Sequence, residues 1–208
     1  MIPLFVDCSK RCIVIFGGGD VAARKAAYFA GNAEVEVVSR SFQQKILNLT
    51  STRRECDVSA LSDAALCSLL ESAFLVIGAL SEPAQNNRIG RICRDRGILF
   101  NNADGEPGDV ILPSVTGGIN FTLAISSGGS SPAVSRFIRE HLEHNFPTLD
   151  SMIALQQRLR TELKQTEPDE KKRNAILWDV LKDPMVWHAL SADSTGAWDL
   201  VIERYLHE

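Results

Sequence analysis

The fold is decided near the start of the chain, where residues 13–22 read Ile13-Val14-Ile15-Phe16-Gly17-Gly18-Gly19-Asp20-Val21-Ala22. A short run of β-branched and aromatic residues that ends in glycine is typical of a buried strand. The segment from Val21 to Ala30 is rich in alanine and favours a helix, because alanine has the highest helix propensity. The sequence therefore predicts a strand, a tight glycine turn and a helix in immediate succession.

The glycine turn has the spacing of a dinucleotide-binding site. Gly17, Gly19 and Ala22 match the pattern G-x-G-x-x-G/A. The first glycine permits the turn, the second lets the backbone approach phosphate oxygens, and Ala22 lets helix and strand pack closely. The helix N-terminus then offers free N–H groups to a pyrophosphate. A glycine turn can also join strand to helix without a ligand, but the order of elements here favours a cofactor site at Gly17, Gly18, Gly19, Asp20, Val21 and Ala22.

The end of the second expected strand bears on the kind of dinucleotide. In NAD enzymes an acidic residue at this point binds the adenosine ribose hydroxyls. Residues 39–42 instead read Ser39-Arg40-Ser41-Phe42. Arg40 either pairs with the 2′-phosphate of NADP or lies under the adenine. We expect Ser39 to Phe42 to belong to the cofactor site, and these residues leave both NAD and NADP open.

The pattern of apolar runs predicts an α/β fold with a Rossmann-type parallel sheet. Further strands are expected at 35–38, 74–77 and 98–101, with a weaker candidate within 51–58, and helix-like segments separate them. After Asp104 the pattern changes. Residues 109–112 and 121–125 indicate a hairpin joined through Thr116-Gly117-Gly118.

The last part of the chain is expected to be helical. A helix should run from Ser131-Pro132 to about His144, with Val134, Phe137, Ile138 and Leu142 facing inward. From Pro147 onward the sequence predicts a helical C-terminal domain. The charged stretch at 167–173 is expected to be a solvated loop and helix start.

Composition excludes several classes of function. With 22 basic and 26 acidic residues the chain lacks the positive charge that nucleic-acid binding requires. No apolar run is long enough to cross a bilayer, and residues 1–5 lack the features of a signal peptide, so we expect a cytoplasmic protein. The five cysteines show no CxxC spacing and predict neither a disulfide framework nor a zinc site.

Asp104 is the first candidate for chemistry. Tyr28 and Tyr205 are the two tyrosines of the chain, and neither is followed by a lysine four residues later, which excludes the short-chain dehydrogenases. All four histidines lie beyond residue 140, so none serves as a base in the sheet-rich half. Asp104 follows the last expected strand, where the cleft of an open α/β sheet lies. It can act as a general base, ligate a metal or simply form an Asx-turn.

The segment Ser126-Ser127-Gly128-Gly129-Ser130-Ser131-Pro132 is the second candidate site. It runs into a helix N-terminus and directs several N–H and hydroxyl groups to one place, which favours an anion. Arg136, one turn into that helix, adds positive charge. The alternative is an ordinary helix capped by Ser130 or Ser131 after a strand.

Several of these motifs together resemble one enzyme family. They are Leu4-Phe5, Gly17-Gly18-Gly19-Asp20-Val21-Ala22 with Arg24-Lys25, Asn102-Ala103-Asp104, Leu112-Pro113-Ser114, and Ala124-Ile125-Ser126-Ser127-Gly128-Gly129-Ser130-Ser131-Pro132. Their order and spacing resemble precorrin-2 dehydrogenase, a family that includes the N-terminal part of bacterial siroheme synthase and the yeast bifunctional dehydrogenase/ferrochelatase.

The resemblance implies oxidation of precorrin-2 to sirohydrochlorin with NAD, in siroheme biosynthesis, by a homodimer. It places the essential aspartate at Asp104, as general base and, in bifunctional members, as a participant in Fe²⁺ or Co²⁺ insertion. It places substrate contacts at Ser127, a phosphorylation site in some members, and we extend them to Gly128, Gly129, Ser130 and Arg136. Whether this chain inserts a metal stays open.

The predicted organisation has three parts. Residues 1–112 form the NAD-binding domain, 113–147 a small α+β region for dimerisation and substrate binding, and 148–208 the helical C-terminal domain. The alternative to an enzyme is a nucleotide-sensing module, which explains the glycine turn but leaves the Ser-Gly segment and the helical tail without a purpose.

Overall fold

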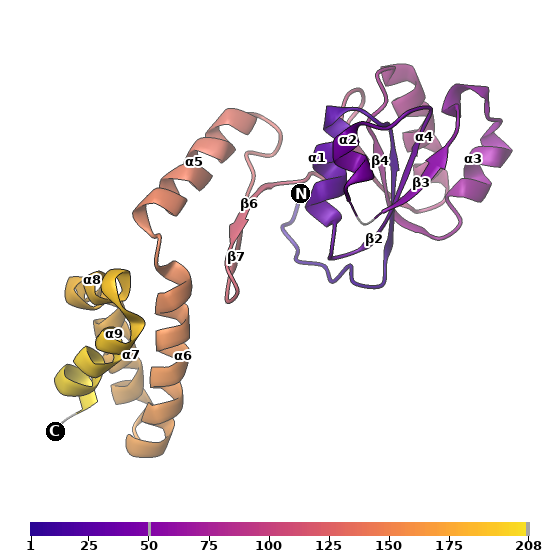
Figure 1. Cartoon of the computed structure of the whole chain (residues 1–208). Coiled ribbons are helices and arrows are strands. Elements are labelled where there is room, and N and C mark those ends of the chain that lie inside the picture. Colours follow the sequence, from indigo (N-terminus) through magenta and orange to yellow (C-terminus); the bar gives the residue numbers. More distant parts are fainter. Residues whose placement is uncertain (50, 207–208) are drawn as a thin grey trace. The chain divides into compact units, whose positions relative to one another are not determined.

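The computed structural model describes residues 1–49 and 51–206 and has two compact units, Met1–Leu112 and Pro113–Glu208 (Figure 1). The first unit contains the sheet and the second is mainly helical. The division of the chain into three functional parts stays a prediction.

The first unit is built on a five-stranded parallel sheet. Its order is β3-β2-β1-β4-β5, so the chain starts in the middle and crosses first to one side and then to the other. The strands are β1 (Cys12–Phe16), β2 (Glu34–Ser39), β3 (Thr52–Glu55), β4 (Ala73–Gly78) and β5 (Leu99–Asn102). This confirms the predicted α/β fold, and the weak candidate at 51–58 is β3.

Helices cover both faces of this sheet. They are α1 (Asp20–Phe29), α2 (Gln44–Leu47), α3 (Asp63–Leu69) and α4 (Pro83–Asp95), with a short 3-10 turn at Val58–Ala60. Side chains alternate across a strand, so β1 sends Ile13 and Ile15 to the face covered by α1 and α2. Val14 and Phe16 enter the opposite core, with α3 and α4. Sequence signals fix the helix starts, because Ser62 caps α3 and Pro83 occupies the first turn of α4.

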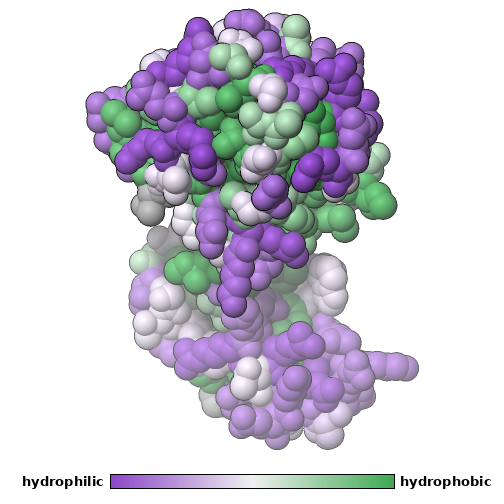
Figure 2. All heavy atoms as spheres, turned by 90° about the vertical axis from the view of Figure 1, so that its right-hand side faces the viewer, coloured by the Kyte–Doolittle hydropathy of each residue, from purple (hydrophilic) through white to green (hydrophobic). Residues whose placement is uncertain are grey.

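The second unit combines a hairpin with a helical bundle. Its elements are β6 (Ser114–Gly117), β7 (Thr122–Ile125), α5 (Pro132–Asn145), α6 (Leu149–Thr166), α7 (Glu170–Lys182), α8 (Pro184–Ala192), α9 (Ser194–Val201) and a π-helical end at Ile202–Leu206. The bundle core forms where a stripe of α6 that includes Met152, Leu159 and Leu163 meets the last three helices. The surface of this unit visible in Figure 2 is mostly hydrophilic.

The predicted strand at 109–112 is wrong. This segment packs Val110 and Leu112 on the core, but it has no regular secondary structure and adds no ladder to the sheet. A backbone hydrogen bond from Val110 N to Phe100 O joins the segment to β5. The Asn101 side-chain amide donates a second hydrogen bond to the Val110 carbonyl oxygen. Pro113, which has no N–H, ends the segment. The hairpin instead pairs 114–117 with 122–125, so part of the predicted connection is strand.

The inward direction predicted for three apolar residues of α5 is also wrong within this chain. Val134, Phe137 and Ile138 are 51%, 68% and 40% exposed. The helix instead packs on the hairpin through its other side, where the Arg139 guanidinium donates to Ser114 Oγ. Leu142 is half-buried. In the described part of the chain, no helix has the length and apolar composition needed to cross a membrane.

Gly90 of α4 provides a test of the packing in the first unit. A Cβ at this position would lie 2.6 Å from Cε1 of the Phe100 ring. Alanine in a helix is intrinsically better than glycine by roughly 1 kcal/mol, but overpacking costs about 1–3 kcal/mol. We expect Gly90→Ala to destabilise the first unit in urea unfolding followed by circular dichroism.

Unfolding of the second unit in the same sample serves as the control. Trp178, Trp187 and Trp198 all lie in the second unit, so tryptophan fluorescence follows that unit alone. Its transition should stay where it is in the unchanged protein. A more stable first unit would show that Phe100 moves away freely.

Candidate functional site

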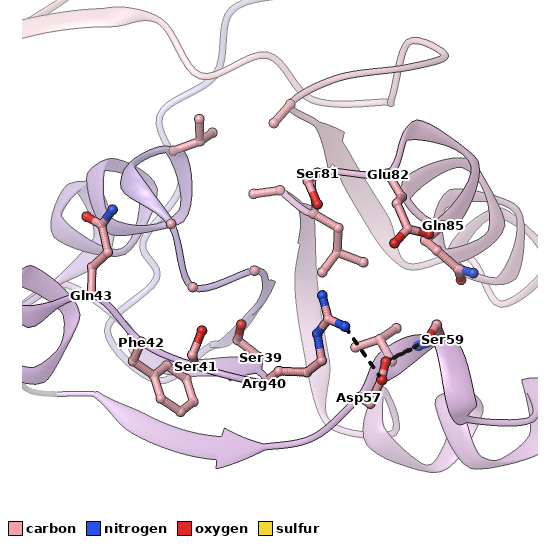
Figure 3. A pocket seen from close by; sticks show the side chains of 18 of the residues that line it. Ser39, Arg40, Ser41, Phe42, Gln43, Asp57, Ser59, Ser81, Glu82 and Gln85 are labelled. Atoms are coloured by element: carbon pink, nitrogen blue, oxygen red, sulfur yellow. Dashed lines mark hydrogen bonds and ion pairs between the residues drawn. The ribbon is translucent and has the colours of Figure 1, made fainter.

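A cavity of about 640 Å³ opens in the first unit at the carboxyl ends of the strands. It lies where the crossovers from β1 leave in opposite directions, the usual ligand position in an open parallel sheet. Its lining residues are Gly17 to Val21, Ser39 to Gln43, Cys56 to Ser59, Ala79 to Glu82, Gln85, Ala103 and Asp104 (Figure 3). The structure thus brings the predicted cofactor segments and Asp104 into one cavity.

Two glycines of the turn are required by the approach of neighbouring backbone. Gly17 has φ +129°, and a Cβ there would overlap the carbonyl oxygen of Ala79. A Cβ on Gly18 would overlap the carbonyl oxygen of Ser41. The loops after β1, β2 and β4 therefore meet at this turn with no room for a side chain.

Gly19 differs because open space surrounds the position of its missing side chain. A Cβ there would meet nothing within 4 Å, although Gly19 lines the cavity. Gly19 is also the N-cap of α1 and has no side chain to accept the first N–H groups of the helix. The turn therefore keeps both the space and the donors that a pyrophosphate needs. Ala22 is fully buried behind the turn and packs against the strand.

The end of β2 forms a second wall of the cavity. Ser39, Arg40, Ser41 and Phe42 all line it, as the sequence predicts for a cofactor site. The Arg40 guanidinium lies 3.9 Å from the carboxylate of Asp57, which follows β3 (Figure 3). Sequence analysis missed Asp57, because the exposed strand β3 gives a weak signal and its end is hard to place.

Asp104 lies on a loop that a buried amide holds from below. The Asn86 side chain, fully buried at the start of α4, donates 3.0 Å to Leu80 O and 3.2 Å to Asp104 O. Its Oδ1 accepts from Leu80 N at 3.0 Å. One amide thus fixes the loop after β4 to the loop after β5. Loss of such a buried group leaves unpaired backbone atoms, which is costly.

The neighbouring Asn87 holds the far side of the same loop. Its Oδ1 accepts from the Asn102 side chain at 3.1 Å and from Glu106 N at 2.9 Å. Asn102 Oδ1 in turn accepts from the Asp104 N–H, so the Asx-turn at this point begins at Asn102 and not at Asp104, where the sequence alternative placed it. The Asp104 residue itself is exposed to the cavity. A fixed backbone therefore presents a carboxylate that is free to meet a ligand.

The Ser-Gly segment lies in the second unit and forms a compact loop before α5. Ser127 Oγ accepts from Ser131 N at 2.9 Å, and Ser126 Oγ accepts from Gly128 N at 3.1 Å. Ser131 caps α5. Arg136 is paired with Glu140 at 2.7 Å and stays exposed. The segment thus has both an ordered loop and an accessible cation, but it belongs to a different unit from Asp104.

The described residues of the two units contain no cluster of side chains arranged to bind a metal ion. Within residues 1–49 and 51–206, no three or more histidine, cysteine, aspartate or glutamate side chains gather as metal ligands would.

Comparison with known proteins assigns the chain to a family. Residues 4–114 match a family model described as "Putative NAD(P)-binding". The protein named "Precorrin-2 dehydrogenase" of Methanosarcina barkeri (strain Fusaro / DSM 804) is 40% identical over 195 residues, 91% of this chain and 87% of that protein. The chain belongs to the precorrin-2 dehydrogenase family. The resemblance found in the sequence motifs is thereby confirmed.

Two further relatives define the extent of this similarity. A siroheme synthase of Sodalis glossinidius (strain morsitans) is 34% identical over 167 residues, which cover 79% of this chain but 35% of that protein. A solved structure described as "SirC, precorrin-2 dehydrogenase" covers 98% of this chain and all of its own, with a TM-score of 0.73 at 19% identity. The precorrin-2 dehydrogenase family thus shares the fold over essentially the whole chain, and siroheme synthases are much longer.

Gly19 allows a test of the cofactor site that leaves the fold intact. Because its Cβ would meet no protein atom, we expect Gly19→Ala to keep the unfolding midpoint but to weaken dinucleotide binding about tenfold or more, the effect of roughly 1.4 kcal/mol. Isothermal titration calorimetry with NAD⁺ measures this.

The contrasting variant is Gly18→Ala, which should lose stability as well as binding because its Cβ overlaps Ser41 O. Unchanged NAD⁺ affinity in Gly19→Ala would mean that the pyrophosphate does not approach this turn.

Proposed function

We propose that the chain is an NAD⁺-dependent dehydrogenase that oxidises precorrin-2 to sirohydrochlorin. The observation that carries the proposal is the shared cavity, which joins the open Gly19 turn to the Asp104 carboxylate in a member of the precorrin-2 dehydrogenase family. A cofactor-binding turn and a candidate base in one cavity are what a hydride transfer with proton loss requires.

The residues present fit a nicotinamide dinucleotide. The space above Gly19, the uncapped start of α1 and the polar wall at Ser39 and Ser41 are suited to a pyrophosphate and a ribose. When bound, NAD⁺ supplies the hydride acceptor. The chain supplies the orientation, through a turn whose backbone at Gly17 and Gly18 is packed closely against the neighbouring loops.

Asp104 is the proposed general base. Oxidation of precorrin-2 releases a hydride and a proton, and a carboxylate is a suitable acceptor for the proton. Asn86 and Asn87 hold the loop on both sides, so the backbone that carries the carboxylate is tied to α4. General base catalysis contributes typically about 10²–10⁴-fold to a rate.

The loop before α5 is the proposed binding place for acidic groups of the substrate. Precorrin-2 carries several carboxylates, which seek N–H, hydroxyl and guanidinium donors. Ser127 Oγ already accepts a hydrogen bond from Ser131 N, so its own hydrogen remains to donate. Gly128, Gly129 and Ser130 leave the loop open, and Arg136 adds a charge whose exposed pair with Glu140 is weak.

A homodimer is the proposed assembly. Val134, Phe137 and Ile138 form an exposed apolar stripe on α5, and an apolar helix face is normally covered. A second copy of the chain is the simplest cover, since the stripe can then bury its own equivalent.

Further predictions concern the cellular compartment and metal insertion. The five cysteines are free thiols, as a reducing compartment such as the cytoplasm would keep them, and we propose that location. Insertion of Fe²⁺ or Co²⁺ into sirohydrochlorin stays a prediction. The rival nucleotide sensor predicts dinucleotide binding without turnover.

Asp104→Asn separates binding from chemistry. We expect NAD⁺ affinity within about twofold of the unchanged protein and a loss of turnover of about 10²–10⁴-fold. The assay follows the absorbance of reduced nicotinamide after addition of precorrin-2. Asp109→Asn, a matched charge change outside the cavity lining, should keep full turnover. Full activity of Asp104→Asn would remove Asp104 from the mechanism.

The apolar stripe on α5 can be tested by size-exclusion chromatography with light scattering. Phe137→Glu should convert a dimer to a monomer, because it would bury charge at the interface. Trp178→Glu alters another exposed aromatic residue of the same unit, 58% exposed, and should leave the dimer intact. A dimer that survives Phe137→Glu must use another surface.

A further inference from the structure

The end of β2 lacks an acidic residue, but the cofactor cavity has a carboxylate from another loop, that of Asp57. A Rossmann-type site commonly selects NAD through an acidic residue at the end of β2, whereas an arginine there favours the 2′-phosphate of NADP. Here β2 ends at Ser39 and Arg40 follows it, which by that rule points to NADP. The neighbouring strand changes this expectation.

The parallel pairing of β2 with β3 brings Asp57 to the same wall. Ser39 pairs with Glu55, and Cys56 N donates to Ser39 O at 3.0 Å. The next residue, Asp57, therefore emerges beside Arg40, and both line the cavity. Figure 3 shows the two side chains meeting, with Ser59 on the other side of the carboxylate.

The carboxylate is held more firmly than the guanidinium. Asp57 Oδ1 accepts from Ser59 Oγ at 2.6 Å and from Ser59 N at 3.0 Å. These two hydrogen bonds, with Arg40 nearby, lower the pKa of the Asp57 carboxyl, so it is ionised at neutral pH. Arg40 is 70% exposed and its contact with Asp57 Oδ2 spans 3.9 Å, which makes a loose, solvent-screened pair.

We propose that Asp57 is the residue that selects NAD⁺ over NADP⁺, by accepting hydrogen bonds from the adenosine ribose through Oδ2. A diol donates to a carboxylate, whereas a 2′-phosphate brings a second negative charge to a carboxylate that Ser59 holds in place. Arg40 offsets part of the charge of this carboxylate. The inference rests on the proposed use of a nicotinamide dinucleotide, and it extends that function to the choice between two cofactors.

The test measures binding of NAD⁺ and of NADP⁺ to the full chain by calorimetry, without precorrin-2. The unchanged protein should bind NAD⁺ at least about tenfold more tightly than NADP⁺, as expected for a charged hydrogen bond. Asp57→Asn should weaken NAD⁺ binding about tenfold without weakening NADP⁺ binding, so the preference largely disappears. Asparagine still caps the turn at Val58–Ala60, which protects the fold.

Two further variants complete the design. Arg40→Gln should keep or increase the preference for NAD⁺, because it removes the cation that offsets Asp57. Asp95→Asn makes the same charge change as Asp57→Asn outside the cavity lining and should alter neither affinity.

Three results would overturn the inference. One is a preference for NADP⁺ that Arg40→Gln abolishes, which would assign selection to the arginine. Another is an equal loss of both dinucleotides in Asp57→Asn, which would place the carboxylate on a part that they share, such as the adenine. The third is an unchanged ratio in Asp57→Asn. Failure of both dinucleotides to bind the unchanged protein would instead contradict the proposed function itself, whereas binding with no turnover of precorrin-2 would leave the selectivity result standing.

Discussion

Backbone hydrogen bonds that continue beyond the strand ends hold the whole site together. Gly17 N donates to Val38 O, and Ala79 N donates to Phe16 O, each at 2.8–2.9 Å. On the outer sides Gln43 N donates to Gly18 O and Ala103 N to Gly78 O. The loops after β1, β2, β4 and β5, which line the cavity, are therefore an extension of the sheet rather than independent segments. This explains why glycine is needed where the loops touch, and why side chains from distant parts of the sequence keep fixed positions.

The central part of this fold is predictable because burial on both faces leaves a plain signal. Strands such as β1 are continuous apolar runs, and the adjacent glycine turn has a spacing tied to one kind of ligand. The edge strand β3 gives a weak signal because all four of its residues are exposed. Asp57 follows that strand, so the least visible element of the sheet carries a residue of the cavity that sequence analysis did not find.

The errors have a common physical origin in interactions that the sequence does not display. Residues 109–112 have the composition of a strand. One backbone hydrogen bond and one from the Asn101 amide pair the N–H and carbonyl groups of Val110 without a strand ladder. The apolar stripe of α5 has the period of a core helix, yet Val134, Phe137 and Ile138 are exposed. Apolar periodicity predicts that a face is covered but does not identify its cover. The sequence allows the Ser-Gly segment to be a loop before a helix capped by Ser130 or Ser131, and in the structure the cap is Ser131.

The amide of Asn86 has a consequence for how the enzyme responds to acidity. It joins the loops after β4 and β5 through three hydrogen bonds made by a group that never ionises. The main chain beneath Asp104 is therefore held equally well in mild acid and mild base. A loop held by an ion pair would loosen as one partner lost its charge. That loosening would add its own pH dependence to the measured rate. The Asn86 amide has no proton to lose or gain across that range, so this link between the two loops adds no titration of its own to a pH profile of the reaction.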